Sequence, residues 1–331
     1  MKNVIATVLV LFICTKVSAQ THIQDALTKE PVSFATISFG NGNGIFADED
    51  GQFVFTKKLY HDIDSLLITA LGYEDIKLAT LNLPSIVKMN PSADQLQEVI
   101  VQAKPKGKFK IQKVKPVAHQ DYFNCWLPTI ESEIAVFFPN TTKKPTKISK
   151  LYLPIKTEAK NWDKRKSKTA KKRAFSTLFK VNFYENENGL PGDVLTYENI
   201  MFWVTEQSDN VFELNIDPND IYLPKNGIFI SIQILGYTDK AGKLLPNKKY
   251  REIKTRRGIV KVSTTFRPLL PFTDKITAQN TYIKRIFLDG NKWLRYEKTN
   301  VKKSKLLQSG MNNYGMGLEL KVYQNSKVKN N

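Results

Sequence analysis

Three acidic residues stand side by side in GIFADEDGQFVF, residues 44–55. Asp48, Glu49 and Asp50 could bind a cation, because carboxylates are the main protein ligands of Ca²⁺. An EF-hand type of loop also needs a third oxygen position and a distant bidentate Glu, and neither follows Gly51. Asp48 can instead accept hydrogen bonds from backbone N–H groups two residues on, and Gly51 can supply a positive φ. The pattern therefore predicts a structural hairpin turn and no metal site.

The other groups that could carry out catalysis lack the partners that their chemistry requires. A zinc peptidase needs closely spaced ligands such as His-Glu-x-x-His, and His22, His61 and His119 do not stand in such a context. Cys125 lies between apolar residues in FNCW, which favours a buried structural thiol over a nucleophile. The chain has no G-x-S-x-G motif. We therefore predict no catalytic residue and no cofactor.

One enzymatic alternative stays open at this point. The two carboxylates of a glycoside hydrolase are paired by their distance in space, so their spacing along the chain does not reveal them. Glu131 and Glu133 share one face of a predicted strand, although such pairs are common on solvated strand edges. The alternative function is therefore an exported glycan-active enzyme.

The densest run of charge is KTEAKNWDKRKSKTAKKR, residues 156–173, which lies between two strand patterns and is predicted to be a long loop. Long loops in compact domains are usually functional or disordered. Trp162 is unusual in such a charged loop, because an exposed Trp tends to find a surface on which to stack. One interpretation is a contact with an anion or glycan, and the other is a solvated loop whose Trp packs back on the domain. The candidate contact residues are Trp162, Lys164, Arg165, Lys166, Lys168, Lys171, Lys172 and Arg173.

Residues 1–19 have the pattern of a secretory signal peptide. Lys2 is followed by an apolar run over residues 4–14 and by the small-residue site Val17-Ser18-Ala19. We expect cleavage after Ala19 and export to the periplasm or to the outer membrane and cell surface. The apolar run is shorter than the roughly 20 residues that a spanning helix needs, so we expect no transmembrane span.

The chain has 50 Lys and Arg residues against 31 Asp and Glu, a formal net charge of +19. Such an excess favours association with polyanions. In an exported protein the expected partners are anionic glycans, lipopolysaccharide phosphates, lipid head groups or another envelope protein, whereas nucleic acid is not expected. General solubility is the alternative explanation of the charge.

Residues 20–103 alternate apolar and polar side chains in short runs. VSFATISF at 32–39, LLITA at 66–70 and two runs at 74–79 and 85–89 are separated by turn residues at a strand-like spacing. This pattern predicts a β-sandwich.

Three motifs in this region occur in a familiar order: IQDALTKEPVSFATISFGNGNGIFADEDGQFVF, LLITALGYEDIKL and LQEVIVQA. With them, residues 21–103 resemble the carboxypeptidase-regulatory-like β-sandwich of bacterial envelope proteins. Thr21 and Ala47 depart from the family pattern, which has Gly and Thr there. The resemblance implies a seven-strand, prealbumin-like sandwich without catalysis, in which Asp48, Gly51 and Gly72 are structural turn residues. The residues that match are Asp25, Pro31, Ala35, Ile37, Asp48, Gly51, Phe53, Gly72, Tyr73, Leu96, Glu98, Val99 and Val101.

A lysine-rich segment separates this region from a second one. Residues 104–119 are predicted to be a linker that the repulsion between its lysines keeps extended. Alternation with period 2 resumes over residues 120–331, for example in GIFISIQILGY at 227–237, without long helical patterns. We predict an all-β chain whose second domain is a larger, antiparallel, jelly-roll-like β-sandwich.

These observations together predict an exported, non-catalytic binding or interaction protein of the cell envelope. The same sandwich often precedes the plug of TonB-dependent outer-membrane receptors, so an accessory role in such an uptake system is a further alternative. The remaining chain cannot hold both a plug and a barrel of about twenty-two strands, so we do not expect a receptor.

Overall fold

The computed structural model describes residues 20–40, 42–92, 105, 107–142, 144–167, 169–246, 250–256, 258–288 and 292–324. The predicted signal peptide, the LQEVIVQA motif and Lys168 lie outside the described residues. The regular secondary structure of the described chain is almost wholly β-strand, with one four-residue α-helix and short 3₁₀ turns. The predicted all-β class is confirmed.

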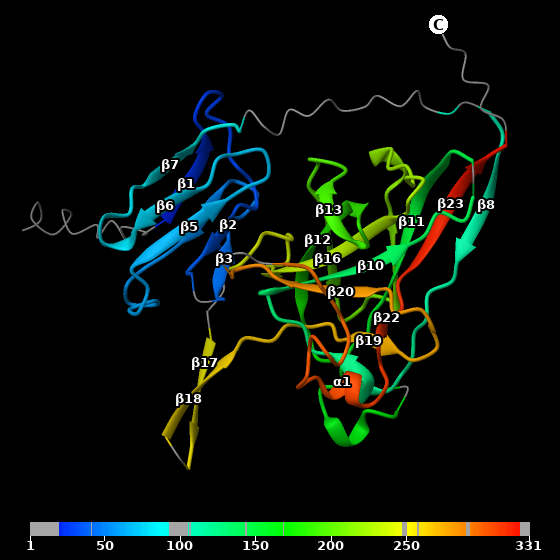
Figure 1. Cartoon of the computed structure of the whole chain (residues 1–331). Helices are drawn as coiled ribbons and strands as arrows, with labels where there is room; N and C mark the ends of the chain where they lie inside the picture. Colours follow the sequence, from blue (N-terminus) through cyan, green and yellow to red (C-terminus); the bar gives the residue numbers. More distant parts are fainter. Residues whose placement is uncertain are drawn as a thin grey trace, which may run out of the picture.

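The N-terminal part is a sandwich of two sheets (blue to cyan in Figure 1). One sheet has the order β4-β1-β7 and the other β3-β2-β5-β6, and β1 pairs with β7 in parallel. Ile23, Ile37, Phe53 and Leu66 point between the sheets and are buried there. The strands are β1 (Gln20–Asp25), β2 (Thr36–Ser38), β3 (Gly44–Phe46), β4 (Gln52–Val54), β5 (Ser65–Thr69), β6 (Ile76–Ala79) and β7 (Ile86–Met89).

The C-terminal part packs a seven-stranded sheet against a four-stranded sheet. The larger sheet has the order β13-β12-β16-β10-β20-β21, with β14 also pairing with β12, and the smaller one has the order β15-β11-β23-β8. The larger sheet contains β10 (Ser132–Phe138), β12 (Ser176–Glu187), β13 (Leu190–Val194), β14 (Ile200–Thr205), β16 (Ile228–Tyr237), β20 (Thr281–Arg285) and β21 (Leu294–Arg295). The smaller sheet contains β8 (Phe109–Val114), β11 (Thr146–Pro154), β15 (Val211–Asn215) and β23 (Gly317–Tyr323).

Smaller elements close one end of this second sandwich and extend from it. A short sheet has the order β22-β19-β9, and β17 and β18 form a separate two-stranded hairpin. Every strand pairing among the described residues of the second sandwich is antiparallel. The remaining elements are β9 (Cys125–Trp126), β17 (Tyr250–Thr255), β18 (Gly258–Ser263), β19 (Leu270–Thr273), β22 (Asn313–Tyr314) and α1 (Lys305–Gln308).

The period-2 alternation of the sequence explains how this core forms. Phe179, Phe183 and Ile230 extend from the large sheet toward Leu151 and Leu318 of the small sheet, and all five are buried. In a strand, alternate residues face the same side, so each alternating run supplies one apolar face.

The predicted linker over residues 104–119 differs from the structure in its central part. Residues 109–114 form β8, which pairs with β23 along its whole length, from Phe109 opposite Tyr323 to Val114 opposite Leu318. The C-terminal sandwich therefore begins at β8 and not at residue 120. The lysines of FKIQKV gave this segment the composition of a linker, although edge strands commonly carry Lys, which opposes pairing with a further strand.

The two sandwiches are in contact through the β2–β3 hairpin. Phe287, between β20 and β21, is fully buried, and its ring lies 5.3 Å from that of Phe46. The buried Ser38 hydroxyl donates to the Phe287 carbonyl over 2.9 Å. On the same side, Lys243 lies 2.9 Å from the Asp50 carboxylate. The two sandwiches are therefore connected by a buried apolar contact in addition to the covalent chain.

Among the described residues, no helix has the length and apolarity to cross a bilayer.

Candidate functional site

The basic loop, residues 156–173, connects β11 to β12 and has an ordered base. The amide of Lys160 donates to the Lys171 carbonyl over 2.7 Å, and the amide of Arg173 donates to the Glu158 carbonyl over 2.8 Å. The Lys156 amide is bonded to the Leu269 carbonyl over 2.8 Å. These bonds hold the two arms of the loop side by side, so that cations distant in the sequence become neighbours.

Trp162 occupies the far part of the loop, at the start of a 3₁₀ turn (Trp162–Lys164). Its ring meets the rings of Tyr122 and Phe123 edge-on, with centroid distances of 5.5 and 5.8 Å. The Arg165 guanidinium lies 4.3 Å from the centre of the ring, a cation–π distance. The side chain still has 45 % of its surface exposed. Trp162 therefore packs back on the domain, as one of the two sequence interpretations predicts, while nearly half of its surface faces solvent.

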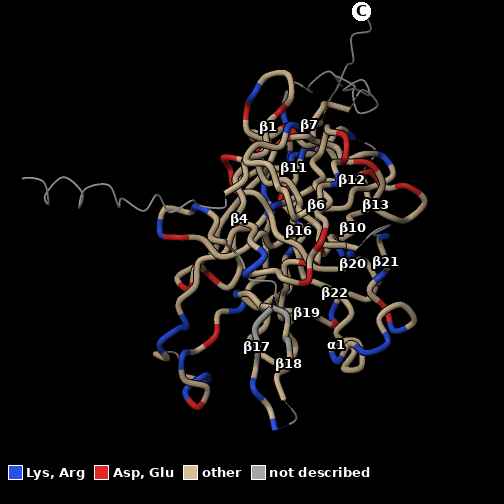
Figure 2. Tube along the Cα trace, turned by 90° about the vertical axis from the view of Figure 1, so that its left-hand side faces the viewer, with Lys and Arg blue, Asp and Glu red and all other residues tan. Residues whose placement is uncertain are grey.

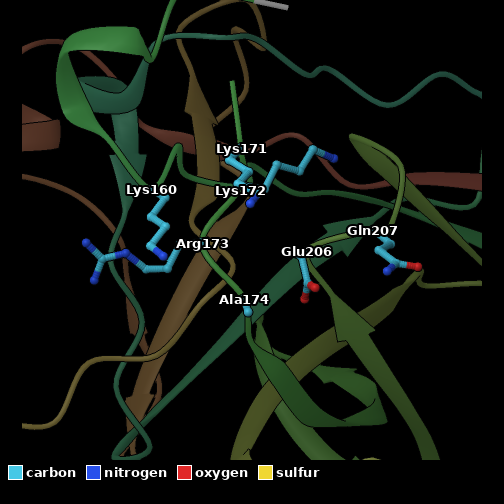
Figure 3. A pocket seen from close by; sticks show the side chains of 7 residues that line it. All are labelled: Lys160, Lys171, Lys172, Arg173, Ala174, Glu206 and Gln207. Atoms are coloured by element: carbon cyan, nitrogen blue, oxygen red, sulfur yellow. The ribbon is translucent and has the colours of Figure 1, made fainter. Parts of the chain in front are cut away.

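A surface depression of about 620 Å³ lies beside the base of the loop. Figure 3 shows Lys160 and the run from Lys171 to Arg173 on one side, and Glu206 and Gln207 on the other. Glu206 and Gln207 come from the turn after β14. A second depression of about 740 Å³ adjoins it and is lined by Lys160, Asn161, Trp162, Lys164, Ser167, Thr169, Ala170 and Lys171.

The cations around these depressions have no anionic partners among the described residues. Lys160, Lys164, Lys171, Lys172 and Arg173 take part in none of the ion pairs there. Like charges held close together repel one another, and a bound anion would relieve that repulsion.

Two acidic side chains beside these cations, Glu158 and Glu206, are already engaged, whereas the exposed Asp163 of the loop takes part in no ion pair with a described residue. Glu158 is paired with Arg267, and Glu206 accepts from the Phe175 amide over 3.2 Å. Lys156 is buried against the Tyr122 ring, and this burial lowers the pKa of its amine. The positive charge that faces solvent is thus supplied by the other cations of the loop, which can hold an anionic ligand electrostatically.

The predicted contact residues do not all lie together. Lys171, Lys172 and Arg173 line the first depression, whereas Trp162 and Lys164 line the second. Arg165 stacks on Trp162, and Lys166 is exposed but lines neither depression. Lys168 lies outside the described residues.

Sequence reasoning missed the role of Lys160 and of the β14–β15 turn. Lys160 links the two depressions, and its place opposite Lys171 could be inferred only if the loop were known to fold back on itself. Glu206 and Gln207 carry no local signal, because a long sequence separation divides them from the loop that they face.

The ADEDG turn between β3 and β4 is held by hydrogen bonds. Asp48 Oδ1 accepts from the amides of Asp50 and Gln52 over 3.1 and 2.8 Å. Gly51 has φ of 69°, and a Cβ there would lie 2.5 Å from the Ile23 carbonyl oxygen. No cluster of three or more His, Cys, Asp or Glu side chains that could hold a metal is found in the described part of the chain. Gly72, the other predicted turn residue, has φ of 88°.

The candidate carboxylate pair is neutralised by neighbouring cations. Glu131 is largely buried and lies 3.7 Å from the half-exposed Arg285. Glu133 is almost fully buried and lies 3.1 Å from the Lys284 amine. Each of the two carboxylates is thus held by one basic side chain, Glu131 by Arg285 and Glu133 by Lys284.

Glu133 also accepts hydrogen bonds from three side chains on the outer face of the large sheet. The donors are Asn182, Tyr184 and Ser231, at 2.9, 2.7 and 2.5 Å. Burial raises the pKa of Glu133, but Lys284 and these donors outweigh it, so that the pKa lies below its ordinary value of 4.5.

Cys125 is half-buried, and its thiol donates to the Asp121 carbonyl over 3.1 Å. Burial raises the pKa of the thiol to about 12, so it stays protonated at neutral pH. A protonated thiol is a poor nucleophile.

Comparison of the chain with protein-family models, with curated proteins and with solved structures finds no match. The fold and the site must therefore be interpreted from their own geometry.

Proposed function

We propose that the protein is a non-catalytic binding protein of the cell envelope, which recognises an anionic glycan at the basic loop. The observation that carries this proposal is the set of unpaired cations around two adjoining depressions, beside the half-exposed ring of Trp162. Phosphate or carboxylate groups of the glycan accept charge-assisted hydrogen bonds from the lysines and Arg173. A sugar ring lies on the exposed part of Trp162.

The proposed cellular setting is export to the periplasm or to the outer membrane, where phosphorylated glycans such as lipopolysaccharide are present. The signal-like pattern of residues 1–19 supports this setting. We further propose that the N-terminal sandwich is a carboxypeptidase-regulatory-like module. Its seven strands and the Asp48–Gly51 turn support that assignment.

Tryptophan fluorescence tests this function directly. Phosphorylated core oligosaccharide, freed of its lipid, is titrated into the wild type and into Trp162→Phe and Trp203→Phe. Trp203 is a matched control, since it is also exposed but lies on β14 outside the loop. We expect a saturable change of emission in the wild type and in Trp203→Phe, and its loss in Trp162→Phe. A change that survives in Trp162→Phe would place the ligand elsewhere.

A further inference from the structure

The positive charge of the chain is concentrated in three segments. The basic loop, the β17–β18 hairpin (residues 250–263) and residues 298–305 together contain 18 basic and 3 acidic residues, against 50 and 31 in the whole chain. These segments therefore account for +15 of the net charge of +19, and the rest of the chain is close to neutral.

The three segments lie at one end of the molecule, which we call the basic end. In Figure 1 the β17–β18 hairpin, α1 and the green basic loop all extend toward the bottom, away from the C-terminus. Figure 2, turned by 90°, shows the hairpin and α1 again at the lower end, with blue segments on both. Lys298, Lys302, Lys303 and Lys305 are exposed there. Most of the net charge thus lies at this end of the molecule, and the lysines of residues 108–115 form a separate basic segment beside β23.

The β17–β18 hairpin adds aliphatic side chains to this charge. It pairs with no other strand among the described residues, and Figure 1 shows it standing away from both sandwiches. Ile259, opposite Lys254, has 68 % of its surface exposed, and Val260, opposite Ile253, is also exposed. Lys254 and Arg256 are exposed and take part in no ion pair with a described residue. An isolated two-stranded hairpin is only marginally stable in water, so a covering surface would stabilise it.

We propose that the basic end docks on the surface of an anionic lipid bilayer, with the β17–β18 hairpin as its anchor. Ile259 enters the boundary between head groups and acyl chains, and Lys254, opposite it on the same face of the hairpin, extends its amine to the lipid phosphates together with Arg256. Cations beside exposed aliphatic residues are the combination that interfacial binding uses. The half-exposed Trp162 suits the same interface, where tryptophan rings are enriched.

A bilayer explains these features better than another partner. A soluble glycan would leave Ile259 and Val260 exposed to water. An extended anionic surface can contact the hairpin, the basic loop and the lysines of 298–305 at once (Figures 1 and 2). The proposal rests on the same basic end as the proposed function, and it adds a lipid surface to the glycan site.

Flotation with lipid vesicles tests the proposal on the full chain without its signal. Vesicles of phosphatidylcholine, with and without phosphatidylglycerol, are mixed with the wild type, with Lys254→Gln/Arg256→Gln and with Ile259→Ser. The matched controls are Lys77→Gln/Lys88→Gln and Leu81→Ser, at exposed positions of the N-terminal sandwich. Unchanged thermal unfolding shows that each variant is folded.

We expect the wild type and both controls to bind the phosphatidylglycerol vesicles and to bind pure phosphatidylcholine weakly. Each cation removed should weaken binding about fivefold, hence about 25-fold for the double variant. Ile259→Ser should weaken it about tenfold. The proposal is overturned if the hairpin variants bind as tightly as the wild type. It is also overturned if the wild type binds equally well to vesicles with and without phosphatidylglycerol.

The free oligosaccharide separates this proposal from the proposed function. The hairpin variants should bind the lipid-free oligosaccharide as the wild type does. If no form of the chain binds the oligosaccharide but the hairpin variants still lose vesicle binding, the proposed glycan site is wrong and the proposed membrane-binding surface is supported. If the hairpin variants lose both, the hairpin is part of a single glycan site and the membrane proposal is wrong.

Discussion

At the turn between β3 and β4, one oxygen atom of Asp48 accepts two backbone hydrogen bonds. Asp48→Ala leaves both amides without this acceptor, which should lower the free energy of unfolding by about 1–3 kcal/mol. Glu49→Ala, at the exposed neighbour, should change it little. Thermal unfolding of both variants measures the difference. Ca²⁺ should leave the melting temperature unchanged, and a Ca²⁺-dependent rise in the wild type that Asp48→Ala abolishes would show a metal site instead.

Glu133 illustrates how a buried carboxylate can be kept ionised. Glu133→Gln leaves the Lys284 amine without its counter-charge, which should lower stability at neutral pH by about 3–5 kcal/mol. Glu131→Gln is the matched control, because its partner Arg285 is half exposed, and it should cost about 1 kcal/mol or less. Denaturant unfolding at neutral pH measures both.

The lowered pKa of Glu133 also sets a pH dependence. In the unfolded chain the pKa of Glu133 is 4.5, and in the folded protein it is lower, so between these two pH values the unfolded state binds more protons. The stabilisation by ionised Glu133 is therefore complete above pH 4.5 and is lost as the pH falls below it. Glu133→Gln should remove that component, which flattens the stability profile below pH 4.5 relative to the wild type. An identical acid profile in both proteins would contradict the assignment.

At the scale of elements, β8 carries the largest revision of the expected domain boundary. Because it pairs with β23 from Phe109 to Val114, its inward amides should be protected from hydrogen exchange in the full chain. Peptides that cover residues 109–114 should exchange more slowly than the segment at 118–121, which has no strand partner. If the amides of residues 109–114 exchange at the rate of an unstructured peptide, this segment is a linker and not a strand.

The interior strands could be predicted because each shows an uninterrupted alternation, as in Ile228 to Ile234 of β16. β8 was not recognised because Lys110 and Lys113 gave it the composition of a tether. The basic loop could be located from its charge, but its folding back depends on backbone bonds such as Lys160 to Lys171, which have no sequence signature. Phe287 stands in the short apolar run Ile286-Phe287-Leu288, and this run has no sequence feature that predicts packing of its ring against the other sandwich.

At the scale of the whole molecule, the two sandwiches should unfold together because of the Phe287 contact. A Cβ on Gly44 would lie 2.4 Å from the Phe287 ring and from the Ile37 carbonyl, so Gly44→Ala cannot keep the present packing. Phe287→Ala removes a fully buried ring, at a cost of about 3–5 kcal/mol.

Differential scanning calorimetry should show one transition for the wild type and two for either variant. Gly72→Ala is a useful comparison, since its Cβ would meet no atom within 4 Å and it lies at a turn of the N-terminal sandwich. It should lower the melting temperature without separating the transitions. Two resolved transitions in the wild type would mean that the sandwiches are independent.

We propose above all that the basic loop binds an anionic envelope glycan, and titration calorimetry with the lipid-free phosphorylated oligosaccharide measures this binding. The comparison is between the wild type, Lys160→Gln/Lys171→Gln in the basic loop, and Lys77→Gln/Lys88→Gln on the N-terminal sandwich. We expect the loop variant to bind at least about tenfold more weakly than the wild type and the control to bind as the wild type does. We also expect added salt to weaken wild-type binding by screening. Equal affinity of all three proteins, or an affinity that salt leaves unchanged, would contradict the proposed glycan site.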